Sequence, residues 1–350
     1  MSLVRLSGSP FQRGFAQKCS GQESVRRVRE MVSLRLSEEA DVLNSRLVKQ
    51  FLKAQWDFSE SHAKAHLDEV RGIAEGHGLF ARDLFAFLHL GFLAPMRQAL
   101  DGCSTLALSD SADGPMVAKN RDYRGEHQAL QRLFHHTDPD RPDTSCLFVG
   151  SLGAPGAFSS GMNSHGLALA DTRIDWSEPG VGWLRYFLMS EILWQAQDIP
   201  SAIALIEDAE HVGGGSLALA DADGRVAMVE LGSSGVAIET GAASYVHTNH
   251  YLAQDLADRV ELLAGDVTSQ SSRARLDTLR SAQAGFGPAT THKDIAALLS
   301  SHGPGNGRLC RHNGGGQDGT ISGVVYLCGP REVVFSAGIP CSAGWQSFRL

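Results

Sequence analysis

Residues 101–123 read DGCSTLALSDSADGPMVAKNRDY, and they contain the clearest pattern of secondary structure in the chain. Gly102 and Cys103 open a run of apolar residues. The turn-forming residues Asp113-Gly114-Pro115 separate this run from a second one, a pattern typical of two antiparallel strands joined in a hairpin. The sequence therefore predicts a hairpin whose first strand begins at a cysteine.

The chain before and after this hairpin differs in pattern. From about residue 21 to residue 100, apolar residues recur at spacings of three and four with charges between them, which predicts helices. Downstream, SLALADADGRVAMVEL at 216–231 predicts a second hairpin with its turn at Asp223-Gly224. Helices are expected over 182–209, broken at Pro200, and over 273–283, and strands over 319–338. This order, without a βαβ alternation, predicts an α+β fold with mainly antiparallel sheets.

Composition limits the class of protein. A chain of 350 residues with 43% hydrophobic and 20% charged residues indicates a folded protein of one large or two ordinary domains, and argues against disorder and coiled coils. The net charge of −8, without a basic run, argues against nucleic acid as a partner. The N-terminus lacks a continuous apolar segment, and no stretch approaches the roughly 18 apolar residues of a membrane span. We therefore expect a cytoplasmic protein that does not enter the membrane.

The cysteines indicate a reducing compartment. Six cysteines are sparse and irregularly spaced, with no CxxC and no pairing typical of zinc sites. Gly303, Gly305 and Gly307 lack the GxGxxG spacing, so a turn-rich loop is expected there rather than a phosphate-binding site. We expect no metal site and no cofactor.

The Gly102-Cys103 pair has two interpretations. A glycine before a cysteine at a strand start offers an unhindered carbonyl beside a nucleophilic thiol, as an N-to-S acyl shift requires. A buried core cysteine is the other interpretation.

Further segments, in the same order along the chain, carry a resemblance to a known family. They are LSGSPFQRG (6–14), EVRGIAEG (69–76), CST (103–105), KNRDY (119–123), GMNSHGL (161–167), YVHTNHY (245–251) and CRH (310–312). Together they resemble the acyl-coenzyme A:6-aminopenicillanic acid acyltransferase family, cysteine members of the N-terminal-nucleophile hydrolases that cut themselves before the cysteine. The resemblance implies a four-layer αββα sandwich. It also implies a mainly helical segment, 1–102, packed on a catalytic segment, 103–350, within one structural domain.

The resemblance implies a zymogen that cleaves the Gly102–Cys103 bond and leaves two chains that stay associated. Cys103 would then be a chain terminus whose α-amine, with a pKa of roughly 8, can take the thiol proton. Asp122 could hold that amine, and Asn249 could donate to the tetrahedral oxyanion. Arg121 or Arg311 could pair with an acidic group near the site. His127, His165 and His312 receive no role.

Two positions differ from the family pattern, and both concern the acyl acceptor. Arg308 stands where many relatives have Ser, and Thr172 where many have Asn. The sequence favours hydrolysis of an amide in a small N-acyl compound, because nothing in it resembles a nucleotide-phosphate site. Acyl-coenzyme A-dependent transfer to a β-lactam-like or other amine is the alternative. The substrate-binding residues stay unknown, and the sequence leaves a homo-oligomer open.

Two alternative hypotheses of function remain. One is a papain-like Cys-His hydrolase in which Cys103 acts inside an intact chain with a histidine as base. The other is a non-catalytic binding protein of the same fold that is never cut.

Overall fold

The computed structural model describes residues 3–93, 102–176, 179–259, 267–303, 305–312 and 319–350. Its helices are α1 (Pro10–Ala16), α2 (Gln22–Glu38), α3 (Ala40–Asn44), α4 (Arg46–His62), α5 (Lys64–His77), α6 (Ala81–Leu93), α7 (Arg185–Gln195), α8 (Ile199–Glu207), α9 (Gln254–Ala257), α10 (Val267–Gln283) and α11 (His292–Leu299). Short 3-10 turns lie at Gln17–Ser20, Gly125–Leu130 and Gly305–Gly307. Residues 94–101, the end of the expected helical segment, lie outside the described part.

The strands form two sheets. They are β1 (Val4–Ser7), β2 (Cys103–Leu108), β3 (Met116–Tyr123), β4 (Gln131–Thr137), β5 (Ser145–Ser151), β6 (Ser160–Asn163), β7 (Ala168–Arg173), β8 (Gly215–Ala220), β9 (Val226–Gly232), β10 (Gly235–Thr240), β11 (Ser244–His247), β12 (Gly319–Leu327), β13 (Glu332–Ser336) and β14 (Gln346–Arg349). One sheet has the order β1-β4-β5-β6-β7-β8-β9-β10, and the other has the order β11-β2-β3-β12-β13-β14. The β1–β4 pairing is parallel and the other described strand pairings are antiparallel.

Both predicted hairpins are confirmed. β2 pairs with β3, and β8 pairs with β9, each in antiparallel register. Their turns contain Gly114 and Gly224 with φ of 82° and 88°, a left-handed conformation that favours glycine. The helical region from 182 to 209 divides into α7 and α8, and Pro200 lies in the first turn of α8 behind the capping residue Asp198. The expected break at Pro200 is therefore the boundary between two helices, and the proline belongs to the first turn of the second one.

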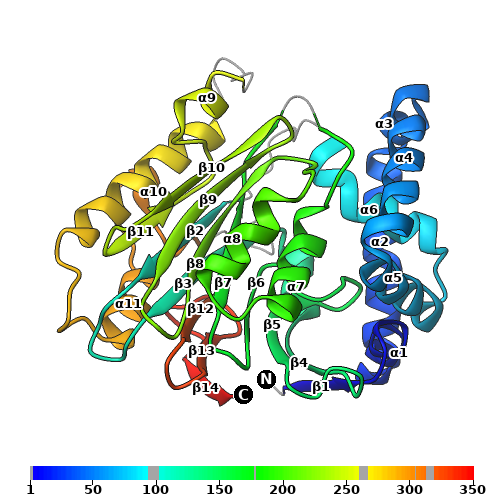
Figure 1. Cartoon of the computed structure of the whole chain (residues 1–350). Helices are drawn as coiled ribbons and strands as arrows, with labels where there is room; N and C mark the ends of the chain where they lie inside the picture. The colour runs from blue at the N-terminus through cyan, green and yellow to red at the C-terminus, as the bar shows by residue number, and fades with distance from the viewer. Residues whose placement is uncertain (1–2, 94–101, 177–178, 260–266, 304, 313–318) are drawn as a thin grey trace.

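The helices and sheets form four layers (Figure 1), and three apolar clusters lie between these layers. The first lies between the eight-stranded sheet and the helices α2, α4–α8. The second contains side chains from both sheets, such as Val117 of β3 and Leu147 of β5. The third lies between the six-stranded sheet and α10 and α11. This confirms the predicted αββα sandwich with mainly antiparallel sheets.

The segment before Cys103 is part of this architecture. β1 is one of the two edge strands of the eight-stranded sheet, and α1 packs against α5 with backbone in contact with backbone. A Cβ added at Gly14 would lie 2.2 Å from the Glu69 carbonyl oxygen, and one added at Gly72 would lie 2.0 Å from that of Phe11. Both motifs at the front of the chain therefore contain glycines that this close helix packing requires.

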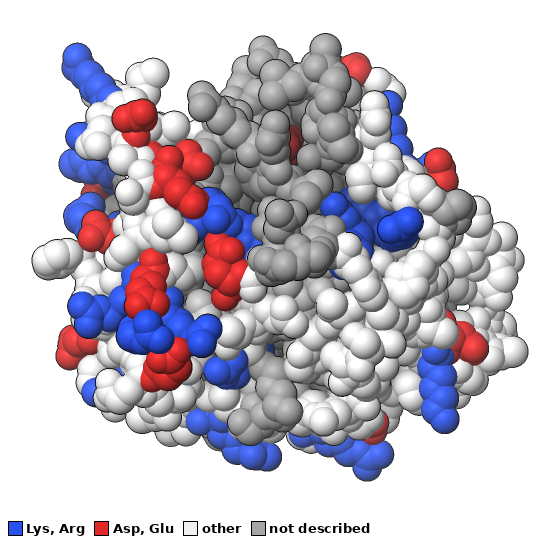
Figure 2. Space-filling view, turned by 180° about the vertical axis from the view of Figure 1, so that it is seen from behind, with Lys and Arg blue, Asp and Glu red and all other residues white. Residues whose placement is uncertain are grey.

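The exposed helices carry charges of both signs. On α2, Arg26 and Arg27 pair with Glu23, and Arg26 also pairs with Glu30, at spacings of three and four residues. Figure 2 shows Lys and Arg interspersed with Asp and Glu on the side of the molecule where these helices lie. Among the described helices, none combines the length and apolar composition that crossing a membrane requires.

Candidate active site

Cys103 is the first residue of β2, and its peptide groups are held on both sides. Its backbone N–H donates to Oδ1 of Asn249 at 2.8 Å, and its carbonyl oxygen accepts from Nη1 of Arg275 at 2.5 Å. Asn249 follows β11, which pairs with β2, so the sheet register brings the amide to the cysteine. The backbone of Cys103 is thus fixed by side chains from two other elements.

Gly102 lies close to three charged side chains. Its carbonyl oxygen accepts from the backbone N–H of Asp122 at 2.8 Å. A Cβ at this position would lie 3.0 Å from Nη2 of Arg275, 3.0 Å from Nη1 of Arg311 and 3.1 Å from Oδ2 of Asp122. A larger residue before Cys103 would therefore have to shift these charged groups by a few tenths of an ångström, whereas glycine fits without a shift.

Asp122 is a buried carboxylate beside Gly102. Its Oδ1 accepts from the Thr320 hydroxyl at 2.6 Å, and its Oδ2 lies 3.4 Å from Nη1 of Arg311. Burial raises the pKa of Asp122, while the guanidinium groups of Arg311 and Arg275 oppose this rise. In the uncut chain the Cys103 N–H donates to Asn249, so the expected contact of Asp122 with a Cys103 amine stays a prediction for a cut chain.

The Asn249 amide uses both of its ends. Oδ1 accepts from Cys103 and from Nη2 of Arg275 at 2.8 Å, and Nδ2 donates to the Arg173 carbonyl oxygen at 2.7 Å. An amide nitrogen carries two hydrogens, so the bond to Arg173 leaves one for another acceptor. The predicted donation to an oxyanion is compatible with this geometry and is not tested by it.

Arg275 is a site residue that the sequence analysis missed. It is fully buried on α10 and contacts Cys103, Asn249 and the Ser104 hydroxyl, the last at 3.0 Å. The sequence carried a usable signal, because Arg275 stands at helical spacing with the buried residues Ser272, Leu276 and Leu279. A cation on the apolar stripe of an amphipathic helix indicates a buried partner.

The two arginines predicted for the site differ in their partners. Arg311 pairs with Asp122, as one of them was expected to do. Arg121 instead donates to Gln131 at 3.3 Å and to Ser151 at 3.1 Å, and among the described residues it makes no ion pair with an acid. The reason is the alternation of side chains along β3, which puts Arg121 and Asp122 on opposite faces of the sheet.

A buried ion triad lies on the same sheet face as Cys103, and the sequence analysis did not identify it. Nζ of Lys119 lies 2.5 Å from Oδ1 of Asp171 and 3.2 Å from the Ser159 carbonyl oxygen. Nε of Arg185 lies 2.8 Å from Oδ2 of the same aspartate. Burial raises the pKa of Cys103, and Lys119 is the strongest opposing influence. Within the triad, the Lys119 ammonium lowers the pKa of Cys103 and the Asp171 carboxylate raises it.

Thr172, one of the two departures from the family pattern, is fully buried. Its hydroxyl donates to the Thr248 carbonyl oxygen at 2.6 Å and lies 2.7 Å from the Ser216 hydroxyl. It also lies 3.3 Å from His247, which in turn lies 2.7 Å from Glu230. Thr172 thus supports the backbone next to Asn249 from within the core.

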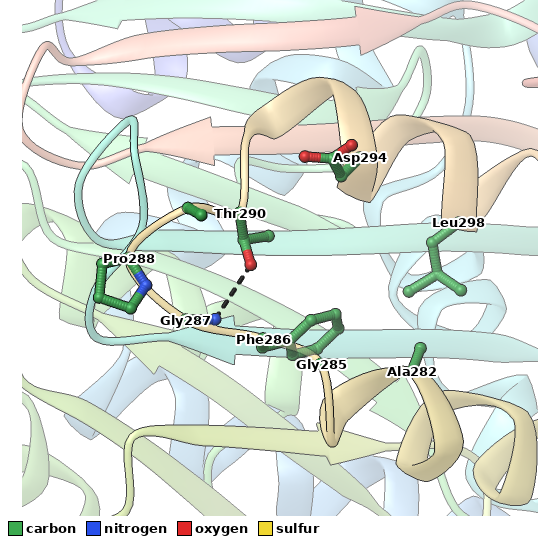
Figure 3. Close-up of a pocket in the computed structure, with 9 residues that line it drawn as sticks. Ala282, Gly285, Phe286, Gly287, Pro288, Thr290, Asp294 and Leu298 are labelled. Atoms are coloured by element: carbon green, nitrogen blue, oxygen red, sulfur yellow. Dashed lines mark hydrogen bonds between the residues drawn. The ribbon is translucent and has the colours of Figure 1, made fainter.

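A surface pocket lies away from this site, at the connection between α10 and α11 (Figure 3). It has a volume of about 450 Å³ and is lined mainly by apolar and glycine residues around Phe286 and Pro288. Its carboxylate, Asp294, already accepts from Thr291 at the start of α11. The residues lining this pocket include no cysteine, serine, lysine or histidine, and the thiol of Cys103 lies elsewhere.

Four residues that could hold a metal ion lie close together, although the sequence spacing indicated no such set. They are His302, Cys310, His312 and Cys341, and their ligand atoms all lie within 4.8 Å of one another. The grouping arises because the fold joins a cysteine from the β13–β14 connection to three residues between α11 and β12, and the expectation of no metal site stays a prediction.

Several solved structures are similar to this chain at low sequence identity. The chain resembles the conjugated bile acid hydrolase of Clostridium perfringens with 13% identity and a TM-score of 0.47, over 71% of this chain and 97% of that one. It resembles an N-acylethanolamine-hydrolyzing acid amidase ortholog of Caenorhabditis elegans with 10% identity and a TM-score of 0.45, over 71% and 100%. It resembles penicillin V acylase of Agrobacterium tumefaciens with 13% identity and a TM-score of 0.38, over 70% of this chain and 85% of that one. No curated protein matches the chain in sequence.

The family comparison covers most of the chain. The model of the acyl-coenzyme A:6-aminopenicillanic acid acyltransferase family matches residues 109–340, about two thirds of the sequence. This range contains Asp122, Asn249, Arg275 and Arg311, and it begins six residues after Cys103. The chain therefore belongs to the acyl-coenzyme A:6-aminopenicillanic acid acyltransferase family, whose enzymes act on carbon–nitrogen amide bonds.

Proposed function

We propose that this protein is a self-processing amidohydrolase whose nucleophile is Cys103. The observation that carries the proposal is the arrangement of the Gly102–Cys103 peptide bond. Its carbonyl oxygen accepts from the Asp122 N–H at 2.8 Å, and its nitrogen donates to Asn249 at 2.8 Å. Donors and acceptors fixed around one peptide bond, with a thiol in the next side chain, favour attack on that bond.

The proposed cleavage consumes one water. The Cys103 sulfur attacks the Gly102 carbonyl carbon, and the Asp122 N–H stabilises the oxygen that becomes negative. The C–N bond then breaks, the nitrogen takes the thiol proton, and a thioester joins Gly102 to the sulfur. Water hydrolyses this thioester and leaves a carboxylate on Gly102 and an amine and a thiol on Cys103.

In the cut protein, the new amine would act as base for the thiol. Attack on a substrate amide gives an acyl-thioenzyme and releases an amine, and water then releases the acid. We propose a small N-acyl compound as the substrate, because the acyl-thioenzyme needs only water to turn over. The family match favours acyl-coenzyme A-dependent transfer to an amine as the second candidate.

The test begins with the intact mass of freshly purified protein under denaturing conditions. We expect two chains, residues 1–102 and residues 103–350, which elute together under native conditions. The cut protein is then given a panel of N-acyl amides, and separately acyl-coenzyme A with free amines. Hydrolysis without a coenzyme supports the proposal, whereas amide formation from acyl-coenzyme A without hydrolysis supports the second candidate. An uncut chain with an unreactive Cys103 contradicts both.

The pH dependence of cleavage follows from the environment of the thiol. Burial raises the pKa of Cys103, so a smaller fraction is thiolate at neutral pH than in an exposed cysteine. We expect the first-order cleavage rate of refolded precursor to keep rising with pH beyond about 8.5, the ordinary cysteine pKa. A rate that levels off below pH 8 would show that burial does not control this step. The measurement is a time course of intact masses across a pH series.

Two variants of Asn249 distinguish the role of its side-chain oxygen from that of its side-chain nitrogen. Asn249→Asp retains an oxygen for the Cys103 amine and removes the Nδ2 donor, whereas Asn249→Ala removes both. If Nδ2 stabilises the oxyanion, we expect both variants to slow acylation of cut enzyme by about 10²- to 10³-fold. Single-turnover kinetics with the best substrate measure this. An Asp variant as fast as the parent would exclude the donor role.

A further inference from the structure

The four residues His302, Cys310, His312 and Cys341 form a compact cluster outside the active site. Nε2 of His312 lies 3.0 Å from Nε2 of His302, 3.0 Å from Sγ of Cys341 and 3.5 Å from Sγ of Cys310. Cys310 is buried and the other three are exposed. The cluster is therefore anchored in the protein and open to ions from solvent.

Hydrogen bonding alone does not account for these contacts. An imidazole nitrogen either carries one hydrogen or offers one lone pair, each in the plane of the ring. The His312 Nε2 has three neighbouring ligand atoms in the cluster, so it can satisfy at most one of them as a simple donor or acceptor. Four ligand atoms that all lie within 4.8 Å of one another are instead an arrangement that a shared cation would explain.

The dimensions and the ligand types select the ion. Zinc binds sulfur at about 2.3 Å and imidazole nitrogen at about 2.0–2.1 Å in a tetrahedron, which puts neighbouring ligand atoms roughly 3.3 to 3.8 Å apart. The three contacts of His312 are 3.0, 3.0 and 3.5 Å long, and all four ligand atoms lie within 4.8 Å of one another, so small shifts of these side chains would bring them into this range. Two cysteines and two histidines make up a set that suits zinc and leaves no coordination position for a substrate or water.

We propose that His302, Cys310, His312 and Cys341 form a structural Zn²⁺ site. Binding requires both thiols to lose their protons to solvent, and the ion would then join the loop after α11, the segment before β12 and the loop between β13 and β14. Arg311 stands between two of the ligands and pairs with Asp122. The metal would therefore fix the backbone that directs Arg311 at the active site. This inference stands apart from the proposed cleavage.

The test measures the metal content of untagged protein, since a histidine tag would itself bind zinc. Wild-type protein is reduced, incubated with Zn²⁺, passed through a desalting column and analysed by elemental mass spectrometry. We expect about one zinc per chain, and a loss of most of it in Cys341→Ser and in His302→Ala. Both residues are exposed, so these variants should fold, which circular dichroism checks. Cys19→Ser changes an exposed cysteine elsewhere and should retain the metal.

A second readout identifies the ligands directly. Cobalt(II) in place of zinc should give the intense visible bands of a tetrahedral site and the charge-transfer band of a thiolate ligand in wild type, and these should be lost in Cys341→Ser. The proposal is overturned if folded wild type holds no more zinc than Cys341→Ser. It is also overturned if Cys310 and Cys341 form a disulfide that persists in the reducing conditions of the assay.

Discussion

A Cys103→Ala variant should remain a single chain of 350 residues under conditions in which the wild type separates into residues 1–102 and 103–350. Without the sulfur, no atom of that side chain can attack the Gly102 carbonyl, so neither the thioester nor the later acyl-enzyme can form. Where removal of a nucleophile has been measured, the loss in kcat is about 10⁶-fold, so both reactions should become undetectable. Intact mass spectrometry and the amide assay measure the two effects.

A variant of a second cysteine serves as the control that the effect is specific to Cys103. Cys19→Ser alters an exposed thiol in the short turn after α1, far from Cys103 in the sequence, and should be cut and active like the wild type. If Cys103→Ala is cut at the same bond, then an added protease or another residue breaks the chain. If the uncut wild type has amidase activity that Cys103→Ala lacks, the internal Cys-His mechanism would replace the one proposed.

An Asp171→Asn variant should lose about 3 to 5 kcal/mol of unfolding free energy. The substitution keeps the shape of the side chain and removes the only negative charge in the triad of Lys119, Asp171 and Arg185, all of which are buried. Two cations would then lie in the protein interior without a counterion, and removing one partner of a buried ion pair typically costs this much. Urea unfolding followed by tryptophan fluorescence measures the change.

This comparison is best made in the Cys103→Ala chain, because an uncut chain unfolds as one molecule. A control is Glu23→Gln on α2, which removes one partner from exposed ion pairs with Arg26 and Arg27. That change should alter stability by less than about 1 kcal/mol. If Asp171→Asn falls within 1 kcal/mol of its parent, the triad does not stabilise the fold as its burial indicates.

The parts of the fold that depend on residues adjacent in the sequence could be predicted from the sequence. The two hairpins follow from local turn chemistry, since a glycine at position 114 or 224 is compatible with the left-handed turn that each hairpin uses. The order of motifs along the chain likewise led to the family and to the four-layer fold. Gly14 and Gly72 belong to two of the sequence motifs, but the need for glycine at these positions becomes clear only from the contact between α1 and α5 in the structure.

The missed parts of the site depend on contacts between residues far apart in the chain. Arg275 reaches Cys103 across 172 sequence positions, and Asp171 reaches Lys119 across 52. Neither separation follows a spacing rule, because the folding of two sheets and a helix layer sets them. The same holds for Cys341, which joins His312 across 29 positions. The opposite directions of Arg121 and Asp122 could have been foreseen, since strand alternation alone separates them.

The pairing of β1 with β4 has a consequence for the turnover of the proposed two-chain enzyme in a cell. The segment before the proposed cut contributes one edge strand of the larger sheet and much of the apolar cluster that covers that sheet. Cutting one peptide bond would not turn it into a subunit that could be exchanged between molecules. Each copy would keep the partner with which it was synthesised, so the two chains would have a fixed ratio of one to one and a single lifetime.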